Sequence, residues 1–310
     1  MIKERNYNGW NAAVLSNGNL EVIAPLDVGP RLLSLRHGES ENLFYEFPEE
    51  RGGKGETHFC LRGGHRLWHS PEHPERTYQP DNDPVEFETV GGGNGFRLTG
   101  RTEERTGLRK SIEVTLLGDR SLRVSHRLTH VGLWAVECAV WPLTMLRRGG
   151  TAALPFPRKG EHPRDLLPDY GVVPWAYTDL SAACWRFHRD FLEIDTREAT
   201  APQKLGLTRY PGWSAYWIEG RTFVKCAPVW AGATYPDHGC CVEVFCNEAM
   251  IELETLSPLS RLEPEASVEH EELWGLLPDL PRPDSQEVCR ERFLPAVREW
   301  LEEVGARPSP

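Results

Sequence analysis

Residues 63–75 read GGHRLWHSPEHPE and concentrate side chains that can bind ligands or move protons. The segment holds three histidines, an arginine and a tryptophan. Imidazole can ligate a transition metal or transfer a proton near neutral pH, and an indole ring can stack on the apolar side of a sugar. The spacing of these side chains decides which chemistry is open to them.

A metal site would require the imidazoles to converge on one ion. His65, His69 and His73 are spaced i, i+4 and i+8, which would align them on a helix. Two glycines precede them, and Pro71 and Pro74 fall within the span, so a continuous helix is not expected. The HExxH motif of zinc proteases is also absent. We therefore expect no metal ion in this segment.

An extended segment would sort the same side chains onto two sides. On a strand, His65, Leu67 and His69 project to one side, and Arg66 and Trp68 project to the other. Such a strand at a cleft offers imidazoles for proton transfer and a ring for stacking. The alternative, from this segment alone, is a surface loop with hydrated histidines in which Trp68 covers the core.

The whole chain has 310 residues, enough for one large β domain or two ordinary domains. Its net charge of −11 argues against nucleic acids and anionic membranes as partners, since both attract clustered positive charge. No apolar run approaches the roughly 18 residues of a membrane helix. The N-terminal stretch has no signal-peptide core, and the eight cysteines include no CxxC pair. We expect a cytoplasmic protein with reduced thiols.

Short strand-like runs separated by turns extend from residue 10 to residue 275. Alternation is clearest at 108–117 and 121–130, and a hairpin is predicted from 213–218 and 221–229 with Glu219-Gly220 at its turn. The further runs are 20–24, 31–37, 96–103, 241–247 and 250–257. This pattern predicts an all-β protein, a large two-sheet antiparallel sandwich.

Helical periodicity is convincing only near the C-terminal end. Residues 283–305 begin with a start signal at Asp284-Ser285 and end at Gly305, and Pro295 is a predicted break. No linker is long or biased enough to divide the chain. We expect one β-sandwich domain at residues 1–280, with residues 281–310 forming a helix packed on that domain and a tail.

Six segments share a pattern with a known group of proteins. They are APLDVGPRLLSLRHGESENLFYE (24–46), GGHRLWHSPE (63–72), VVPWAYTDL (172–180), APQKLGLTRYPGWSAYW (201–217), RTFVKCAPVW (221–230) and IELETLSPLSRLEPEASVEHEELW (251–274). Together they resemble the galactose mutarotase-like superfamily of β-supersandwich proteins, which includes the aldose 1-epimerases, and most closely a bacterial branch of it. The last segment is the most specific.

The resemblance implies acid–base chemistry on a sugar without a cofactor. In the epimerases a glutamate on the LET-type strand is the general base, which removes a proton from the C1 hydroxyl while an acid protonates the ring oxygen. This role falls on Glu254. Strand alternation places Glu252 on the same face, so the sequence alone leaves both carboxylates as candidates.

The general acid is matched only in part. The epimerases typically carry two active-site histidines, of which His65 can represent the first, with His69 as a neighbouring candidate. The segment that should hold the second reads CAVWPLTML (138–146) and contains no histidine. His65 is therefore the expected acid, and a cleft that binds a sugar without epimerising it remains an alternative.

The basic candidates for sugar contacts have alternative partners within the chain. The resemblance gives Arg66 hydrogen bonds to substrate hydroxyls, and Arg31 is a second candidate that could instead pair with an acid across the sheet. Lys204 and Lys225 could bind an anionic sugar, or pair with a glutamate such as Glu243 or Glu254.

Eleven tryptophans are available for stacking, and Trp68 and Trp213 are the two that we expect at the cleft. The predicted function is an aldose 1-epimerase-like isomerase acting on a monosaccharide or sugar derivative. A non-catalytic carbohydrate-binding protein with the same cleft is the alternative, and a scaffold with a vestigial cleft is a more distant one.

Overall fold

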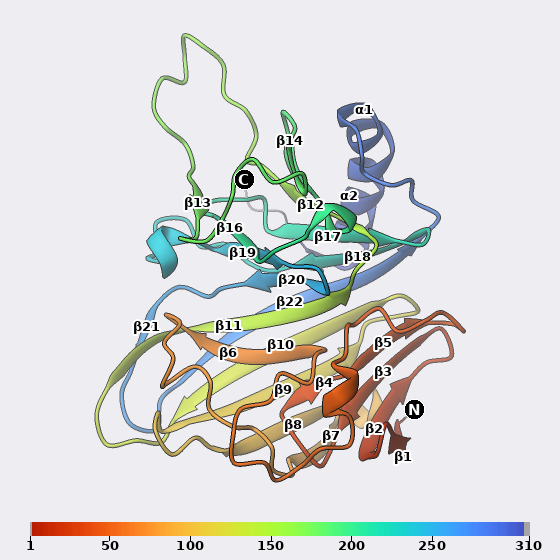
Figure 1. The fold of residues 1–310 in the computed structure, drawn as a ribbon, viewed down its shortest axis with the longest axis vertical. Coiled ribbons are helices and arrows are strands. Elements are labelled where there is room, and N and C mark those ends of the chain that lie inside the picture. The colour runs from red at the N-terminus through yellow and green to blue at the C-terminus, as the bar shows by residue number, and fades with distance from the viewer. Residues whose placement is uncertain (1, 307–310) are drawn as a thin grey trace.

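The structure, a computed structural model, describes residues 2–306 and is built almost entirely of β-strands (Figure 1). The strands are β1 Ile2–Tyr7, β2 Trp10–Ser16, β3 Leu20–Pro25, β4 Arg31–Leu32, β5 Ser34–His37, β6 His65–Ser70, β7 Glu86–Val90, β8 Gly95–Thr102, β9 Leu108–Leu116, β10 Ser121–His130, β11 Val136–Arg147, β12 Thr151–Pro155, β13 Val172–Pro174, β14 Trp185–Phe187, β15 Phe191–Asp195, β16 Gln203–Leu207, β17 Trp213–Ile218, β18 Arg221–Cys226, β19 Val242–Cys246, β20 Met250–Thr255, β21 Ser260–Leu262 and β22 Ser267–Pro278. The helices are α1 Gln286–Val288 and α2 Leu294–Glu303. Residues 1 and 307–310 of the predicted ranges lie outside this description.

The strands form three antiparallel sheets. The ten-stranded sheet has the order β14-β15-β12-β17-β18-β22-β10-β9-β8-β7, and the eight-stranded sheet has the order β13-β16-β19-β20-β11-β6-β4, with β21 also paired to β11. Strands β1, β2, β3 and β5 form a separate four-stranded sheet. The predicted all-β class is confirmed, and the N-terminal strands add a sheet that the two-sheet prediction did not include.

Side-chain alternation explains why the clearest strands were predictable. Ile112 and Val114 of β9 are buried, and the residues between and beside them are partly exposed, as expected for a strand with one face on the core. The hairpin of β17 and β18 closes through Glu219 and Gly220, both at positive φ (52° and 76°), which suits a two-residue turn between twisted strands.

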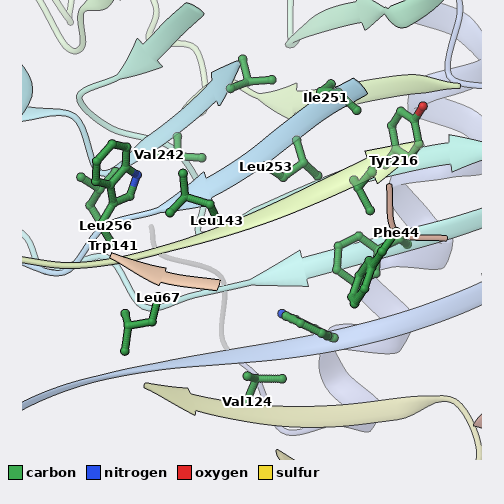
Figure 2. Close-up of a cluster of buried hydrophobic side chains, with 14 of the residues drawn as sticks. Phe44, Leu67, Val124, Trp141, Leu143, Tyr216, Val242, Ile251, Leu253 and Leu256 are labelled. Atoms are coloured by element: carbon green, nitrogen blue, oxygen red, sulfur yellow. The ribbon is translucent and has the colours of Figure 1, made fainter. Parts of the chain in front are cut away.

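The main core lies between the ten-stranded and eight-stranded sheets. Leu67 of β6 and Val124 of β10 lie toward each other in Figure 2 and belong to one buried cluster, which takes in side chains of both sheets. We call the side of the eight-stranded sheet that faces the ten-stranded sheet its inner face, and the opposite side its outer face.

The C-terminal helical segment covers the other side of the ten-stranded sheet. It begins after Ser285, whose side chain accepts a hydrogen bond from the N–H of Val288, and Pro295 lies in the first turn of α2 after a π-helical turn. Within residues 2–306 no helix is both long enough and apolar enough to cross a membrane.

Trp213 belongs to this helix-covered region and not to a sugar site. It is opposite Cys226 in the β17–β18 register and is buried in the cluster that includes Phe293 and Trp300. Because the neighbouring Lys225 points into the main core, Trp213 and Cys226 point away from it, toward the helix. The placement of Trp213 at a cleft with Glu254 is therefore corrected.

Candidate functional site

Strand pairing gathers carboxylates and aromatic rings on the outer face. Leu143 of β11 is opposite Arg66 of β6 on one side and Glu254 of β20 on the other, so these three side chains share a face. Four further side chains are placed on it by register and alternation, namely Trp68, Trp141, Glu243 and Glu252. The strand pairings thus bring together residues from distant parts of the chain.

Glu254 is buried and is held through one of its two oxygens. Its Oε2 accepts hydrogen bonds from Trp141 Nε1 at 2.7 Å and from Lys204 Nζ at 2.8 Å. Its Oε1 has no hydrogen-bond partner among residues 2–306. The carboxylate is therefore oriented by the protein through Oε2, and its buried Oε1 is left with unused capacity to accept a hydrogen bond.

Lys204 neutralises part of this cluster. Its Nζ lies 2.8 Å from both Glu243 Oε2 and Glu254 Oε2 and sits over the rings of Trp141 and Trp175, at 4.7 and 4.8 Å. Burial alone would lower the pKa of Lys204, but the two glutamates raise it well above its usual value. Of the two predicted roles for this lysine, the structure shows the pairing with glutamates.

Glu252 is the carboxyl on this face that the protein leaves without a partner. The residue is only 8% exposed and lies between the apolar Met145 and Phe245 in the strand register. Its side chain makes no hydrogen bond or ion pair with any residue from 2 to 306. Burial raises the pKa of Glu252 to about 8; Glu254 adds to the rise, and Lys204 opposes it. This environment favours the protonated form of the Glu252 carboxyl.

Arg66 and Trp68 form the adjoining part of the outer face. The buried Arg66 guanidinium stacks on the rings of Phe59 and Trp68, at 4.6 and 4.7 Å, and lies 3.7 Å from Asp81. Asp81 also accepts a 2.5 Å hydrogen bond from Arg31. Arg31 thus pairs with an acid, as its alternative prediction stated, although that acid comes from a loop.

His65 and His69 lie on the inner face, away from Glu254. His65 is fully buried, with Nδ1 2.9 Å from Thr144 Oγ1 and Nε2 2.7 Å from His126 Nε2 on the ten-stranded sheet. His69 follows on the same face by alternation. The expectation that His65 and Glu254 border one cleft is therefore wrong, since adjacent residues Arg66 and His65 project to opposite sides of β6.

Lys225 also lies in the core and cannot contact a ligand on the outer face. Its Nζ donates a hydrogen bond to the carbonyl of Leu253 at 2.9 Å and pairs with Glu272 at 2.9 Å. Glu272 in turn accepts a 2.5 Å hydrogen bond from Thr255 Oγ1. The residues on either side of Glu254 are thus both attached to this buried ion pair.

His65, His126 and Glu272 offer three ligand atoms within 4.8 Å of one another, a group that suggests a metal site. The hydrogen bonds indicate a different role. The Nδ1–H of His126 donates to the carbonyl of His270, so its Nε2 accepts a hydrogen bond from the Nε2–H of His65. The Lys225 ammonium already balances Glu272, and a metal ion would add uncompensated positive charge. We interpret the group as a structural hydrogen-bond network.

Two aromatic residues after β13 also border the carboxylates, although the sequence did not single them out. Trp175 covers the Lys204 ammonium, and Tyr177 is 50% exposed. Burial raises the pKa of Tyr177 to about 12, and Lys204, Glu254 and Glu252 are close enough to influence it. The signal in the sequence was the resemblance of segment 172–180, which carries both rings.

Comparison with known proteins finds no matching family model and no matching curated protein. Solved structures do match. A putative aldose 1-epimerase from Escherichia coli K12 shares a TM-score of 0.55 at 12% identity, covering 86% of this chain and 98% of that one. A galactose mutarotase-like protein from Lactobacillus casei gives 0.56 at 10% identity, covering 86% and 100%. The fold is similar to that of galactose mutarotase-like proteins.

The likeness extends to a larger protein as well. A TPR-domain containing protein from Parabacteroides distasonis gives a TM-score of 0.58 at 15% identity over 88% of this chain. The present chain spans about half of that protein, 48% of its length. At these identities the comparisons establish a shared fold, and one fold hosts several activities.

Proposed function

We propose that the outer face binds a monosaccharide or sugar derivative and interconverts its anomers, as aldose 1-epimerases do. The observation that supports this most is the state of Glu254. One of its oxygens is held by Trp141 and Lys204, and the other has no partner among residues 2–306. An oriented carboxylate with one oxygen that no group of the described residues engages suits the role of a general base.

The chemistry needs one base and one acid. Glu254 takes the proton of the C1 hydroxyl, whose oxygen becomes a carbonyl oxygen. The bond between C1 and the ring oxygen breaks, its electron pair goes to the ring oxygen, and the acid supplies a proton there. Rotation about C1–C2 and the reverse steps then close the ring on the other face of C1. The reaction returns both protein groups to their starting states, so it consumes no cofactor.

The charges on this face favour an uncharged sugar. Lys204 is paired with two glutamates, and Arg66 is paired with Asp81. A phosphate or carboxylate on the sugar would therefore find both cations already paired with acidic groups. It would also lie close to the carboxyl of Glu252. We therefore propose neutral aldoses as the ligand class, with the half-exposed ring of Tyr177 available for stacking.

The test is an NMR exchange measurement of α and β anomers over a panel of neutral aldoses. The wild-type protein should accelerate exchange for at least one sugar, and Glu254→Gln should lower that rate by about a hundredfold or more. Glu271→Gln, on the exposed side of β22, is the matched control and should have no effect. Wild-type rates equal to the spontaneous rate would rule out the enzymatic function.

A non-catalytic sugar-binding protein is the second candidate, and one observation favours it. The eight-stranded sheet carries histidine only at 65 and 69, and both side chains lie on the inner face. This candidate predicts saturable binding of a sugar in calorimetry, weakened by Tyr177→Ala, without any acceleration of anomer exchange.

A further inference from the structure

The proposed ring opening requires a group that donates a proton to the ring oxygen, and this general acid has not yet been assigned. His65 is separated from Glu254 by the sheet itself and is engaged by Thr144 and His126. No other histidine except His69 belongs to the eight-stranded sheet, and His69 also points inward. No histidine of the eight-stranded sheet therefore faces Glu254, and the candidates on the outer face are other titratable groups.

Glu252 has the position that such a donor needs. It precedes Glu254 by two residues on β20, so the two side chains share a face with their Cα atoms about 7 Å apart. The two oxygens that exchange protons in the reaction are bonded to the same sugar carbon. Side chains as long as glutamate can reach both of them from neighbouring positions of one strand.

The contacts of the two carboxyl groups differ in the way that the two roles require. Glu254 accepts hydrogen bonds from Trp141 and Lys204, which stabilise a carboxylate. Glu252 is nine-tenths buried, has apolar Met145 and Phe245 as its register neighbours, and has no hydrogen-bond or ion-pair partner among the described residues. An apolar surrounding with little solvent favours the protonated acid.

The charged groups around Glu252 come from several elements. Glu254 on its own strand and Glu72, after β6, oppose its ionisation, whereas Lys204 on β16 and Arg66 on β6 favour it. The phenols of Tyr78 and Tyr177 approach it from the loops. Burial is the largest influence and holds the pKa of Glu252 at about 8, so a proton is available at neutral pH.

We propose that Glu252 is the catalytic proton donor to the ring oxygen, in the place that a histidine takes in the aldose 1-epimerases; this inference rests on the function proposed above. As the bond between C1 and the ring oxygen breaks, the Glu252 carboxyl gives its proton to that oxygen and becomes a carboxylate. On ring closure the carboxylate takes the proton back, while Glu254 returns its proton to the C1 oxygen. The two glutamates thus exchange ionisation states twice in each cycle.

The experiment is a pH–rate profile of anomer exchange for the wild type, Glu252→Gln and Glu252→Asp, with the sugar that the wild type turns over fastest. Because the donor must be protonated, wild-type kcat should fall as pH rises through about 8. Glu252→Gln should lose about a hundredfold or more in kcat with little change in KM, and the alkaline decline should disappear. Glu252→Asp should restore part of the rate together with a pH-dependent decline.

The outcomes separate this inference from the proposed function. Exchange that requires Glu254 but is unchanged in rate and pH profile by Glu252→Gln overturns the assignment of the donor alone. The absence of wild-type acceleration overturns both. Should Glu252→Gln fail to fold, carbon-13 NMR of glutamate-labelled wild-type protein replaces it. One carboxyl group should titrate near pH 8 and shift on sugar binding, and the absence of such a group overturns the inference.

Discussion

Lys204 carries the positive charge that allows two glutamates to be buried side by side. Glu243 and Glu254 are both fully buried and face each other in the register of β19 and β20, and the ammonium lies 2.8 Å from each. Removing one partner of a buried ion pair lowers the free energy of unfolding by more than the pair contributes to it, because the remaining charge is buried without compensation.

Lys204→Met should therefore destabilise the fold by about 3–5 kcal/mol, as measured by urea denaturation at neutral pH. Lys54→Met, whose side chain is 57% exposed, is the matched control and should change the free energy of unfolding by less than about 1 kcal/mol. Adding Glu243→Gln to Lys204→Met should recover part of the loss. If Lys204→Met and the double variant lost the same free energy of unfolding, the explanation by uncompensated charge would be contradicted.

At the scale of elements, β6 shows what the sequence could and could not predict. Alternation correctly placed His65 and His69 on one side and Arg66 and Trp68 on the other. All six side chains of β6 are buried, however, so no polar side marks the face that is turned away from the core. Which side meets the other sheet depends on strand partners far along the chain, and the sequence therefore suggested the wrong side for the imidazoles.

The same limit explains the other corrected and missed residues. Glu252 and Glu254 were correctly placed on one face, because that follows from spacing alone. The pairing of Arg66 with Asp81 involves a loop, whose path no periodicity describes. Glu243 was recognised only as one partner that Lys204 could take, and the register of β16, β19 and β20 was needed to show that it takes both glutamates.

The histidine network between the sheets predicts sensitivity to acid. Burial lowers the pKa of His126 and His270 from 6.5 to about 3. The unfolded chain therefore binds protons at a higher pH than the folded one, and the free energy of unfolding falls as pH drops from about 6.5 toward about 3. Each such histidine contributes a slope of at most about 1.4 kcal/mol per pH unit.

Replacing His270 by Gln should reduce this slope, because the amide can still donate to Thr255 but does not titrate. Urea denaturation at a series of pH values between about 4 and 7 measures it. His73→Gln, on an exposed loop, should leave the slope unchanged. Equal slopes for the wild type and His270→Gln would show that His270 can be protonated within the fold.

At the scale of the whole molecule, the C-terminal helix and the ten-stranded sheet fit closely at one glycine. A Cβ on Gly275 of β22 would lie 2.4 Å from the ring of Trp300, which is fully buried and donates a hydrogen bond to Ser121 Oγ at 3.0 Å. The ring cannot move aside without losing that hydrogen bond. The helix was predictable from its periodicity and end signals, whereas its docking site depends on this fit and on Trp213, which the sequence suggested for a different task.

Gly275→Ala should destabilise the protein by about 1–3 kcal/mol through overpacking, as measured by thermal or urea denaturation. In a Trp300→Leu background the same substitution should cost less, since the shorter side chain leaves room for the methyl group. Anomer exchange per folded molecule should stay the same, because the helix covers the sheet that does not carry Glu254. If Gly275→Ala lowered the free energy of unfolding equally in the wild-type and Trp300→Leu backgrounds, a direct clash between the new methyl group and Trp300 would be contradicted.

The buried pair of Lys225 and Glu272 fixes the strand that carries both glutamates. It holds the Leu253 carbonyl and the Thr255 hydroxyl, one position before and one after Glu254, from the side of the sheet opposite to the Glu254 side chain. The backbone around Glu252 and Glu254 is therefore held in place by contacts within the core. Under the proposed function, differences in the preferred sugar among related proteins would arise in the loops that bear Tyr78 and Tyr177. Exchanging those loops should change the preferred sugar, while Glu252 and Glu254 keep their positions.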